Sequence, residues 1–248
     1  MYRGRRVSAV IPALNEQLAI GKVVQQLNSL KNANGLKIID DVIVCDNGSN
    51  DNTAQVAEQS GARVIQQATP GYGIACLTAL SIVKPCEIIL FVDGDDSCFI
   101  EQTTSLLAGI VNGDNLAIGS RVKGNVEKGA LTSIQKFGNA LAAFLIRRLW
   151  HYDITDLGPF RAIKTSTLKK LDMQDQTFGW TVEMQIKAIQ LGFKISEYPV
   201  DSKVRIGQSK ISGTIKGSIK AGFSILTMIA KLRLMQRKTL AKFALEDS

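Results

Sequence analysis

Short apolar runs alternate with longer amphipathic stretches along the first half of the chain. The short runs are aliphatic or β-branched and are bounded by Pro, Gly, Asn or Asp, as buried strands are. They span residues 7–11, 38–45, 63–65, 87–92 and 116–118. The stretches between them carry apolar residues at helical spacing, at residues 16–30, 51–60, 74–83 and 101–111. This alternation predicts an α/β fold in which helices cover both faces of a mostly parallel central sheet.

Polar segments follow three of the predicted strands. Residues 12–16 read PALNE, residues 46–51 read DNGSND and residues 93–96 read DGDD. In sheets of this kind, ligands bind beyond the carboxyl ends of the strands. The three segments therefore predict a polar binding site at one edge of the sheet.

The acidic segment 93–96 predicts a metal site. Carboxylates this close together repel one another, so three of them within four residues need a compensating charge. A divalent cation that joins Asp93 and Asp95 to phosphate oxygens would supply it. The chain has one histidine and no Cys-x-x-Cys spacing, so the usual nitrogen and sulfur ligands of zinc are missing. We therefore expect Mg²⁺ or Mn²⁺.

Other nucleotide-binding folds lack their phosphate-binding motifs in this chain. No G-x-G-x-x-G follows the first strand, and no G-x-x-x-x-G-K-[ST] occurs. The PGYG segment at 70–73 is typical of a tight connection. Dinucleotide-binding and P-loop folds therefore fit poorly.

Four motifs together resemble those of the inverting family 2 glycosyltransferases, which have the GT-A fold. They are IPALNE at 11–16, DNGS at 46–49, DGD at 93–95 and GSR at 119–121, in the order and spacing of that family. Three later segments are similar to motifs of the dolichyl- or polyprenyl-phosphate glycosyl synthase branch: DLGPFR at 156–161, GWTVEM at 179–184 and RIGQSKIS at 205–212. We therefore expect a GT-A domain at 1–212 and a basic, amphipathic helical tail at 213–248.

The resemblance implies a role for each matching residue. Asp46 would recognise the base of a nucleotide diphosphate sugar, while Asp93 and Asp95 would hold the metal and the diphosphate. Arg121 and a loop containing Arg205 would face phosphate oxygens, which suit guanidinium groups. The implied substrate-binding residues are Pro12, Asn15, Glu16, Asp46, Gly71, Asp93, Arg161, Arg205, Ser209 and Lys210, and the candidate catalytic residues are Asp95, Arg121, Glu183 and Asp156.

The chain departs from that branch in two places. Many lipid-phosphate members have a glutamine near the metal where this chain has Ser97, so its metal shell would contain more water. They also tend to have a second arginine in the region that Gln135 and Lys136 occupy here. The Q-x-x-R-W signature of processive synthases is absent after Glu183, which favours transfer of one sugar per encounter.

Two classes of acceptor fit the sequence. A phosphate acceptor is already anionic and needs no general base, whereas a hydroxyl acceptor needs one. Glu183 is the first candidate base and Asp156 the second. Each also has an ordinary structural interpretation, because Glu183 could be an exposed helix carboxylate and Asp156 could pair with Arg161.

The net charge of +8 is concentrated in the tail, since no acidic residue occurs between Ser202 and Leu245. One helical stripe is apolar, with Ile215, Ile219, Phe223, Leu226 and Ala230, and another carries Lys216, Lys220 and Lys231. The longest uncharged run, 221–230, is too short to cross a bilayer. Such a helix can lie on an anionic membrane, and the alternative is packing against the domain or a second subunit.

The leading hypothesis is a peripheral enzyme at the cytoplasmic face of a membrane. It would move one hexose from a donor of the UDP-glucose or GDP-mannose type to a polyprenyl phosphate, with inversion. The alternatives are an inverting transferase for a hydroxyl acceptor and a non-catalytic nucleotide-sugar binding module. Nucleic acid is not an expected partner, because the basic tail lacks interleaved aromatic residues.

Overall fold

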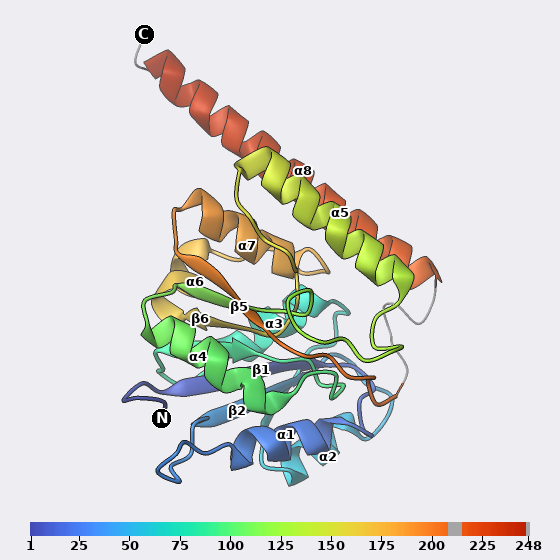
Figure 1. The fold of residues 1–248 in the computed structure, drawn as a ribbon. Coiled ribbons are helices and arrows are strands. Elements are labelled where there is room, and N and C mark those ends of the chain that lie inside the picture. The colour runs from blue at the N-terminus through green and yellow to red at the C-terminus, as the bar shows by residue number, and fades with distance from the viewer. Residues whose placement is uncertain (208–214, 247–248) are drawn as a thin grey trace.

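The computed structural model describes residues 1–207 and 215–246. A seven-stranded sheet in the order β3-β2-β1-β4-β6-β5-β7 forms its centre (Figure 1). All neighbouring strands are parallel except β6, which runs antiparallel to β4 and β5. The strands are β1 (Val7–Ala13), β2 (Asp41–Asp46), β3 (Arg63–Gln66), β4 (Ile88–Phe91), β5 (Leu116–Ser120), β6 (Arg161–Lys164) and β7 (Ile195–Pro199).

Helices cover both faces of this sheet. They are α1 (Ile20–Ser29), α2 (Thr53–Gln59), α3 (Tyr72–Ser81), the 3-10 turn η1 (Ile100–Gln102), α4 (Thr103–Val111), α5 (Ser133–Trp150), α6 (Thr165–Leu171), α7 (Trp180–Gln190) and α8 (Ile215–Glu246). In β1, Ala9 and Ile11 belong to the core with α1 and α4, while Val10 belongs to the core with α3 and α7. Successive strand residues point to opposite faces, which is why these strands are apolar throughout.

The expected α/β fold with a mostly parallel sheet is confirmed. The first helix begins at Ile20 rather than at residue 16, and β2 begins at Asp41, after a buried turn that holds Ile38 and Ile39. The sequence pattern missed β6 and β7. β6 begins and ends with a basic residue, and β7 is an edge strand of mixed polarity, so neither shows the continuous apolar run that indicated the other strands.

The helices α5 and α8 lie side by side on α7, on the opposite side of the molecule from α1 and α2 (Figure 1). The face of α8 that packs on them contains Met228, Ile229 and Leu232. It is not the apolar stripe expected from the sequence, since Phe223 is 72% exposed. The tail therefore has two apolar faces, one of which packs against the domain. Within residues 1–207 and 215–246, no helix is both long and apolar enough to span a bilayer.

Candidate active site

A cavity of about 220 Å³ opens at the carboxyl ends of β1, β2 and β4, where the sequence predicts a site. We call it the strand-end cavity. Its lining includes Pro12, Glu16, Gly71, Asp93, Asp95 and Arg205. Six of the predicted site residues therefore converge on one space, although they lie far apart along the chain.

Asn15 and Asp46 shape the loops beside this cavity without lining it. Asn15 adopts a left-handed backbone (φ 53°), and its side-chain oxygen accepts a hydrogen bond from the backbone N–H of Asn50 at 2.7 Å. The carboxylate of Asp46, which is 6% exposed, accepts one from the N–H of Ser49 at 3.0 Å. Both side chains thus hold the 46–50 turn in place.

Asn47 lines the cavity and was missed as an individual residue, although the sequence motif contains it. Its amide nitrogen donates to the carbonyls of Gln67 (3.0 Å) and Thr69 (2.7 Å), and its oxygen accepts from the N–H of Gly71 (2.8 Å). One side chain therefore fixes the loop that forms a wall of the cavity.

The first turn of α3 packs directly on the loop before α7. The N–H groups of Gly73 and Ile74 donate to the carbonyls of Thr177 and Gln176, both at 3.0 Å. A Cβ at Gly73 would overlap the carbonyl oxygen of Asp175, so only glycine fits this contact. Because Thr177 also lines the cavity, the 174–178 loop is part of its wall.

The carboxylate of Glu183 binds the backbone of the 174–178 loop without lining the cavity. It accepts hydrogen bonds from the N–H groups of Gln174 (3.0 Å) and Asp175 (2.8 Å) and pairs with Lys187 at 2.8 Å. The residue is 2% exposed and lines none of the cavities described here. The possibility that Glu183 is an exposed helix carboxylate is therefore wrong.

The three carboxylates of the DGDD segment have different surroundings. Asp96 has a left-handed backbone (φ 58°), which directs its buried carboxylate to Lys22 (2.7 Å) and Lys203 (2.8 Å). Lysines therefore neutralise this carboxylate, and the cation expected from the sequence is not needed for it. Asp93 and Asp95 are the two that reach the strand-end cavity.

Asp93 and Asp95 influence each other electrostatically. Burial, together with the charge of Asp95, raises the pKa of Asp93 to about 6. The hydroxyl of Tyr72 donates to Asp93 at 3.2 Å, and Arg205 pairs with Asp95 at 3.0 Å. The backbone N–H of Ser97 binds the other oxygen of Asp95 at 3.0 Å. Ser97, which stands where many members of the lipid-phosphate branch have a glutamine, thus contacts Asp95 through its backbone N–H.

These two carboxylates suit a hard cation that shares its coordination with a ligand. Among the residues that the structure describes, no group of three or more His, Cys, Asp and Glu side chains could hold a metal. Mg²⁺ in particular is usually bound by one or two carboxylates, with water and phosphate oxygens in the other positions. The donor set therefore fits Mg²⁺ or Mn²⁺ carried with a phosphate ligand, and it does not fit a closed metal site made of protein alone.

Arg121 lies between the strand-end cavity and a second space. The carboxylate of Asp156 accepts hydrogen bonds from Arg121 Nε (2.8 Å), Nη2 (2.7 Å) and the backbone N–H (2.7 Å). Arg121 lines a groove of about 650 Å³ along α5, which we call the α5 groove. It also lines a narrow gap that contains Asp93 and Arg205. A fixed guanidinium therefore lines both the α5 groove and the narrow gap, and this gap shares Asp93 and Arg205 with the strand-end cavity.

Arg161 is not brought to either space. It has no exposed surface, and its guanidinium donates to the carbonyls of Leu157 (3.0 Å), Gly158 (3.1 Å) and Thr181 (3.0 Å). Burial lowers its pKa to about 10. The alternative in which Asp156 pairs with Arg161 is wrong, because Asp156 pairs with Arg121. The structure thus gives Arg161 main-chain partners and places it away from the cavities.

Two further residues line the strand-end cavity although the sequence did not predict them there: Phe178 had no signal, and Lys220 was named only as part of the basic stripe of the tail. Phe178 and Lys220 line the cavity from the loop before α7 and from α8. Their positions depend on how α8 packs, which local patterns do not encode. Ser209 and Lys210 lie outside the described residues.

The sequence is similar to those of several glycosyltransferases. A model of the family "Glycosyl transferase family 2" matches residues 8–171. The dolichyl-phosphate hexose transferase of Haloferax volcanii is 27% identical over 232 residues, which is 92% of this chain and 96% of that protein. The undecaprenyl-phosphate mannosyltransferase of Micrococcus luteus is 29% identical over 226 residues, covering 86% of this chain and 90% of that protein.

The fold is also found among solved structures. Glucosyl-3-phosphoglycerate synthase from Mycobacterium tuberculosis, crystallised with Mn²⁺, UDP and phosphoglyceric acid, aligns with a TM-score of 0.75 at 21% identity. The alignment covers 93% of this chain and 79% of the other. Another crystal structure of that enzyme, with Mg²⁺ and UDP, aligns with a TM-score of 0.70. At this identity the likeness concerns the fold.

Proposed function

The chain belongs to glycosyl transferase family 2, and from that premise we propose that it transfers one hexose, with inversion, from a nucleotide diphosphate sugar to a polyprenyl phosphate. The observation that carries the proposal is the position of Arg121. It stands between a cavity lined by two carboxylates and a groove with apolar walls. A lipid phosphate offers the matching pair of chemical groups, an anionic head and an apolar chain.

The strand-end cavity is the proposed donor site. Pro12 and Asn47 line the part beside β1 and β2, where a nucleoside would bind. Asp93 and Asp95 line the same cavity, and Asp93 also lines the narrow gap with Arg121. Arg205 and Lys220 supply positive charge for a diphosphate. UDP complexes of the structural neighbour support a nucleotide here.

Asp93 and Asp95 are the proposed ligands of Mg²⁺ or Mn²⁺. When bound, the cation would stabilise the negative charge that develops on the leaving diphosphate. Asp93 and Asp95 would hold the cation, and Arg205, which pairs with Asp95 at 3.0 Å, would supply positive charge beside it. The Mn²⁺ and Mg²⁺ complexes of the neighbouring structures support this assignment.

The α5 groove is the proposed acceptor site. Its walls include Val122, Leu131 and Phe144, and Lys136 and Arg147 add positive charge. An isoprenoid chain can lie on the apolar walls while Arg121 binds the phosphate. Lys136 occupies the region where the lipid-phosphate branch has its second arginine, and it keeps a cation there.

A phosphate acceptor also agrees with the surroundings of the two candidate bases. The carboxylate of Glu183 is used by two backbone N–H groups and Lys187, and that of Asp156 is used by Arg121. Glu183 lines none of the cavities described above, and Asp156, which lines the α5 groove, has no exposed surface and has both oxygens bound by Arg121. Neither carboxylate is therefore free to take a proton from a substrate hydroxyl. Asp156 would instead hold Arg121 at the acceptor phosphate.

The surface around α5 and α8 suits a membrane-bound acceptor. Phe137 on α5 is 70% exposed and Phe223 on α8 is 72% exposed, and both helices carry lysines and arginines. Exposed aromatic residues beside cations favour an anionic membrane surface. We infer a peripheral position at the cytoplasmic face, where nucleotide sugars and lipid phosphates meet.

The test is donor turnover by the purified protein with UDP-glucose and GDP-mannose in parallel, with Mn²⁺, and with or without undecaprenyl phosphate. Formation of a hexosyl lipid phosphate that needs the lipid, Mn²⁺ and one of the two donors is the expected result. The Arg121→Ala variant should raise the KM for the lipid phosphate. Equal turnover without lipid would contradict the proposal and favour a hydroxyl acceptor or hydrolysis.

A further inference from the structure

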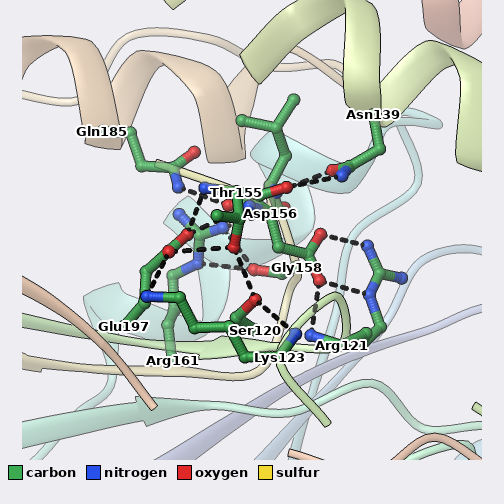
Figure 2. Close-up of polar contacts among 11 residues, drawn as sticks. Ser120, Arg121, Lys123, Asn139, Thr155, Asp156, Gly158, Arg161, Gln185 and Glu197 are labelled. Atoms are coloured by element: carbon green, nitrogen blue, oxygen red, sulfur yellow. Dashed lines mark hydrogen bonds and ion pairs between the residues drawn. The ribbon is translucent and has the colours of Figure 1, made fainter. Parts of the chain in front are cut away.

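The irregular segment 155–157 is held entirely by side chains (Figure 2). Each of its backbone N–H and C=O groups has a side-chain partner. The N–H groups of Thr155 and Asp156 donate to Glu197 (2.7 and 3.0 Å), and that of Leu157 donates to Asn139 (2.9 Å). The carbonyls of Thr155, Asp156 and Leu157 accept from Asn139 (2.9 Å), Gln185 (2.9 Å) and Arg161 (3.0 Å).

This arrangement has a physical reason. Buried backbone groups need hydrogen-bond partners, and a segment outside helices and strands must find them elsewhere. Asp156 has no exposed surface. Its neighbours reach it from α5, β6, α7 and β7, so the segment is fixed by four separate elements. The position of the Asp156 carboxylate is therefore set by side chains other than Arg121.

Glu197 makes the largest number of these contacts. One carboxylate oxygen accepts the two backbone N–H groups, and the other accepts the hydroxyl of Thr155 at 2.9 Å and pairs with Lys123 at 3.0 Å. The side chain is 4% exposed. Removing it would leave two buried N–H groups without a partner directly beside Asp156.

We propose that Glu197 is a positioning residue for transfer: it fixes Asp156, which in turn holds the Arg121 guanidinium at the acceptor phosphate. Three hydrogen bonds join Asp156 to Arg121, so a shift of the 155–157 segment moves the guanidinium with it. The inference rests on the proposed role of Arg121. Glu197 lies outside the strand-end cavity, so it acts on the acceptor side only.

The test compares Glu197→Ala and Glu197→Gln with the wild type. We expect Glu197→Ala to lower kcat/KM for the lipid phosphate by about 100-fold, because a displaced guanidinium no longer meets the phosphate. Binding of UDP or GDP with Mn²⁺ should stay within a factor of about two. Glu197→Gln should recover part of the loss, since an amide oxygen can still accept both N–H groups.

Asp114→Asn is the matched control. Asp114 is also a buried carboxylate, 1% exposed, that pairs with a lysine, Lys194, and accepts a hydrogen bond from Tyr198 on the same strand as Glu197. It lies before β5, at the end of that strand away from Arg121. The Asp114→Asn variant should have a lower melting temperature and an unchanged kcat/KM for the lipid phosphate. Lys123→Ala should also have little effect, because it keeps the two N–H contacts of Glu197.

A double-mutant cycle with Arg121→Ala tests whether Glu197 acts through Arg121. If Glu197 acts through Arg121, adding Glu197→Gln to Arg121→Ala causes no further loss. Additive losses, or full activity of a folded Glu197→Ala, would overturn the inference. If Glu197→Ala does not fold, the Glu197→Gln cycle gives the same decision. If Arg121→Ala itself leaves the KM for the lipid phosphate unchanged, the proposed function fails instead.

Discussion

Single residues in the DGDD segment differ in role because the backbone points them in different directions. The left-handed backbone at Asp96 directs its carboxylate to two lysines, whereas Asp93 and Asp95 face the strand-end cavity. Left-handed backbone is uncommon outside glycine and better tolerated by Asn and Asp. Asp96 therefore stabilises the turn, while the carboxylates of Asp93 and Asp95 are available to a ligand in the strand-end cavity.

Asp95→Asn should abolish donor turnover, by about 1,000-fold or more, because it removes one of the two proposed metal ligands. The fold should persist, since the amide has the size of the carboxylate and its oxygen can still accept from the Ser97 N–H. Turnover and the melting temperature are the measurements. Asp96→Asn is the control in the same turn: it should lose stability by about 1–3 kcal/mol while keeping Mn²⁺ binding. Retained turnover of Asp95→Asn with a chelator present would contradict the metal assignment.

The raised pKa of Asp93 gives a pH dependence with a defined sign. The folded chain keeps a proton on Asp93 up to about pH 6, whereas an unfolded aspartate has already lost it. Without metal, the free energy of unfolding should therefore fall as pH rises from about 4 to about 6. A cation must displace that proton, so Mn²⁺ affinity should be about tenfold weaker near pH 5 than near pH 7. Calorimetric titration measures the Mn²⁺ affinity at the two pH values, and equal affinities would mean that no proton on Asp93 competes with the cation.

At the scale of elements, the loop before α7 connects three parts of the molecule. Glu183 holds its backbone, the first turn of α3 packs on it, and the hydroxyl of Thr177 bonds that of Ser224 on α8 at 2.8 Å. Thr177 and Phe178 are also cavity wall. The proposed donor site is thus built partly by an element that the family model, which ends at residue 171, does not cover.

Glu183→Gln tests whether this carboxylate supports the loop or acts as a base. A glutamine amide at position 183 would bind the two backbone N–H groups of the loop more weakly and would form no ion pair with Lys187. The KM for the donor should therefore rise about tenfold while kcat changes little. Steady-state kinetics over a range of pH distinguishes support of the loop from general-base catalysis. A fall in kcat of about 100-fold or more, with the donor KM unchanged, would instead identify a general base and favour a hydroxyl acceptor.

The two faces of α8 should respond differently to substitution. Leu232 is 5% exposed in the contact with α5 and α7, so Leu232→Ala should cost about 2–5 kcal/mol of unfolding free energy. Leu226→Ala, at a position 39% exposed, should cost much less. Denaturant unfolding of both variants measures this. Equal costs would mean that both faces are packed in solution.

At the scale of the whole molecule, the proposed acceptor groove and the exposed apolar residues belong to the same helices. Phe144 lines the α5 groove and is 57% exposed, and the neighbouring α8 carries Phe223. Both helices also carry lysines and arginines. The proposed lipid acceptor would therefore enter the α5 groove from this surface.

Phe223→Glu should weaken binding to vesicles that contain anionic lipid by about tenfold, because it replaces an inserting apolar side chain with an acid. Leu36→Glu is the control, since Leu36 is 62% exposed but lies in the loop between α1 and β2. Co-sedimentation at low and high salt measures both. Identical losses for the two variants, or none for Phe223→Glu, would remove the membrane surface from α8.

Local patterns in the amino-acid sequence are enough to establish the α/β fold, the edge of the sheet that carries the site, and the family. Strand periodicity, helical spacing and motif order are all properties of neighbouring residues. For this reason the sequence alone identifies Asp93, Asp95, Pro12 and Glu16, which the fold then brings to one cavity. The strands β6 and β7 escape this kind of prediction because they lack a local apolar signal.

The pairing of charged groups, in contrast, depends on tertiary packing. Arg121 meets Asp156 from 35 residues away, and Glu197 meets it from 41, at distances along the chain where no periodicity operates. Arg161 resembles a phosphate-binding residue in the sequence, yet packing buries it among carbonyl groups. A buried polar group takes the partner that the fold brings within hydrogen-bond distance. The local pattern therefore names the candidates, and the packing of distant elements assigns their partners.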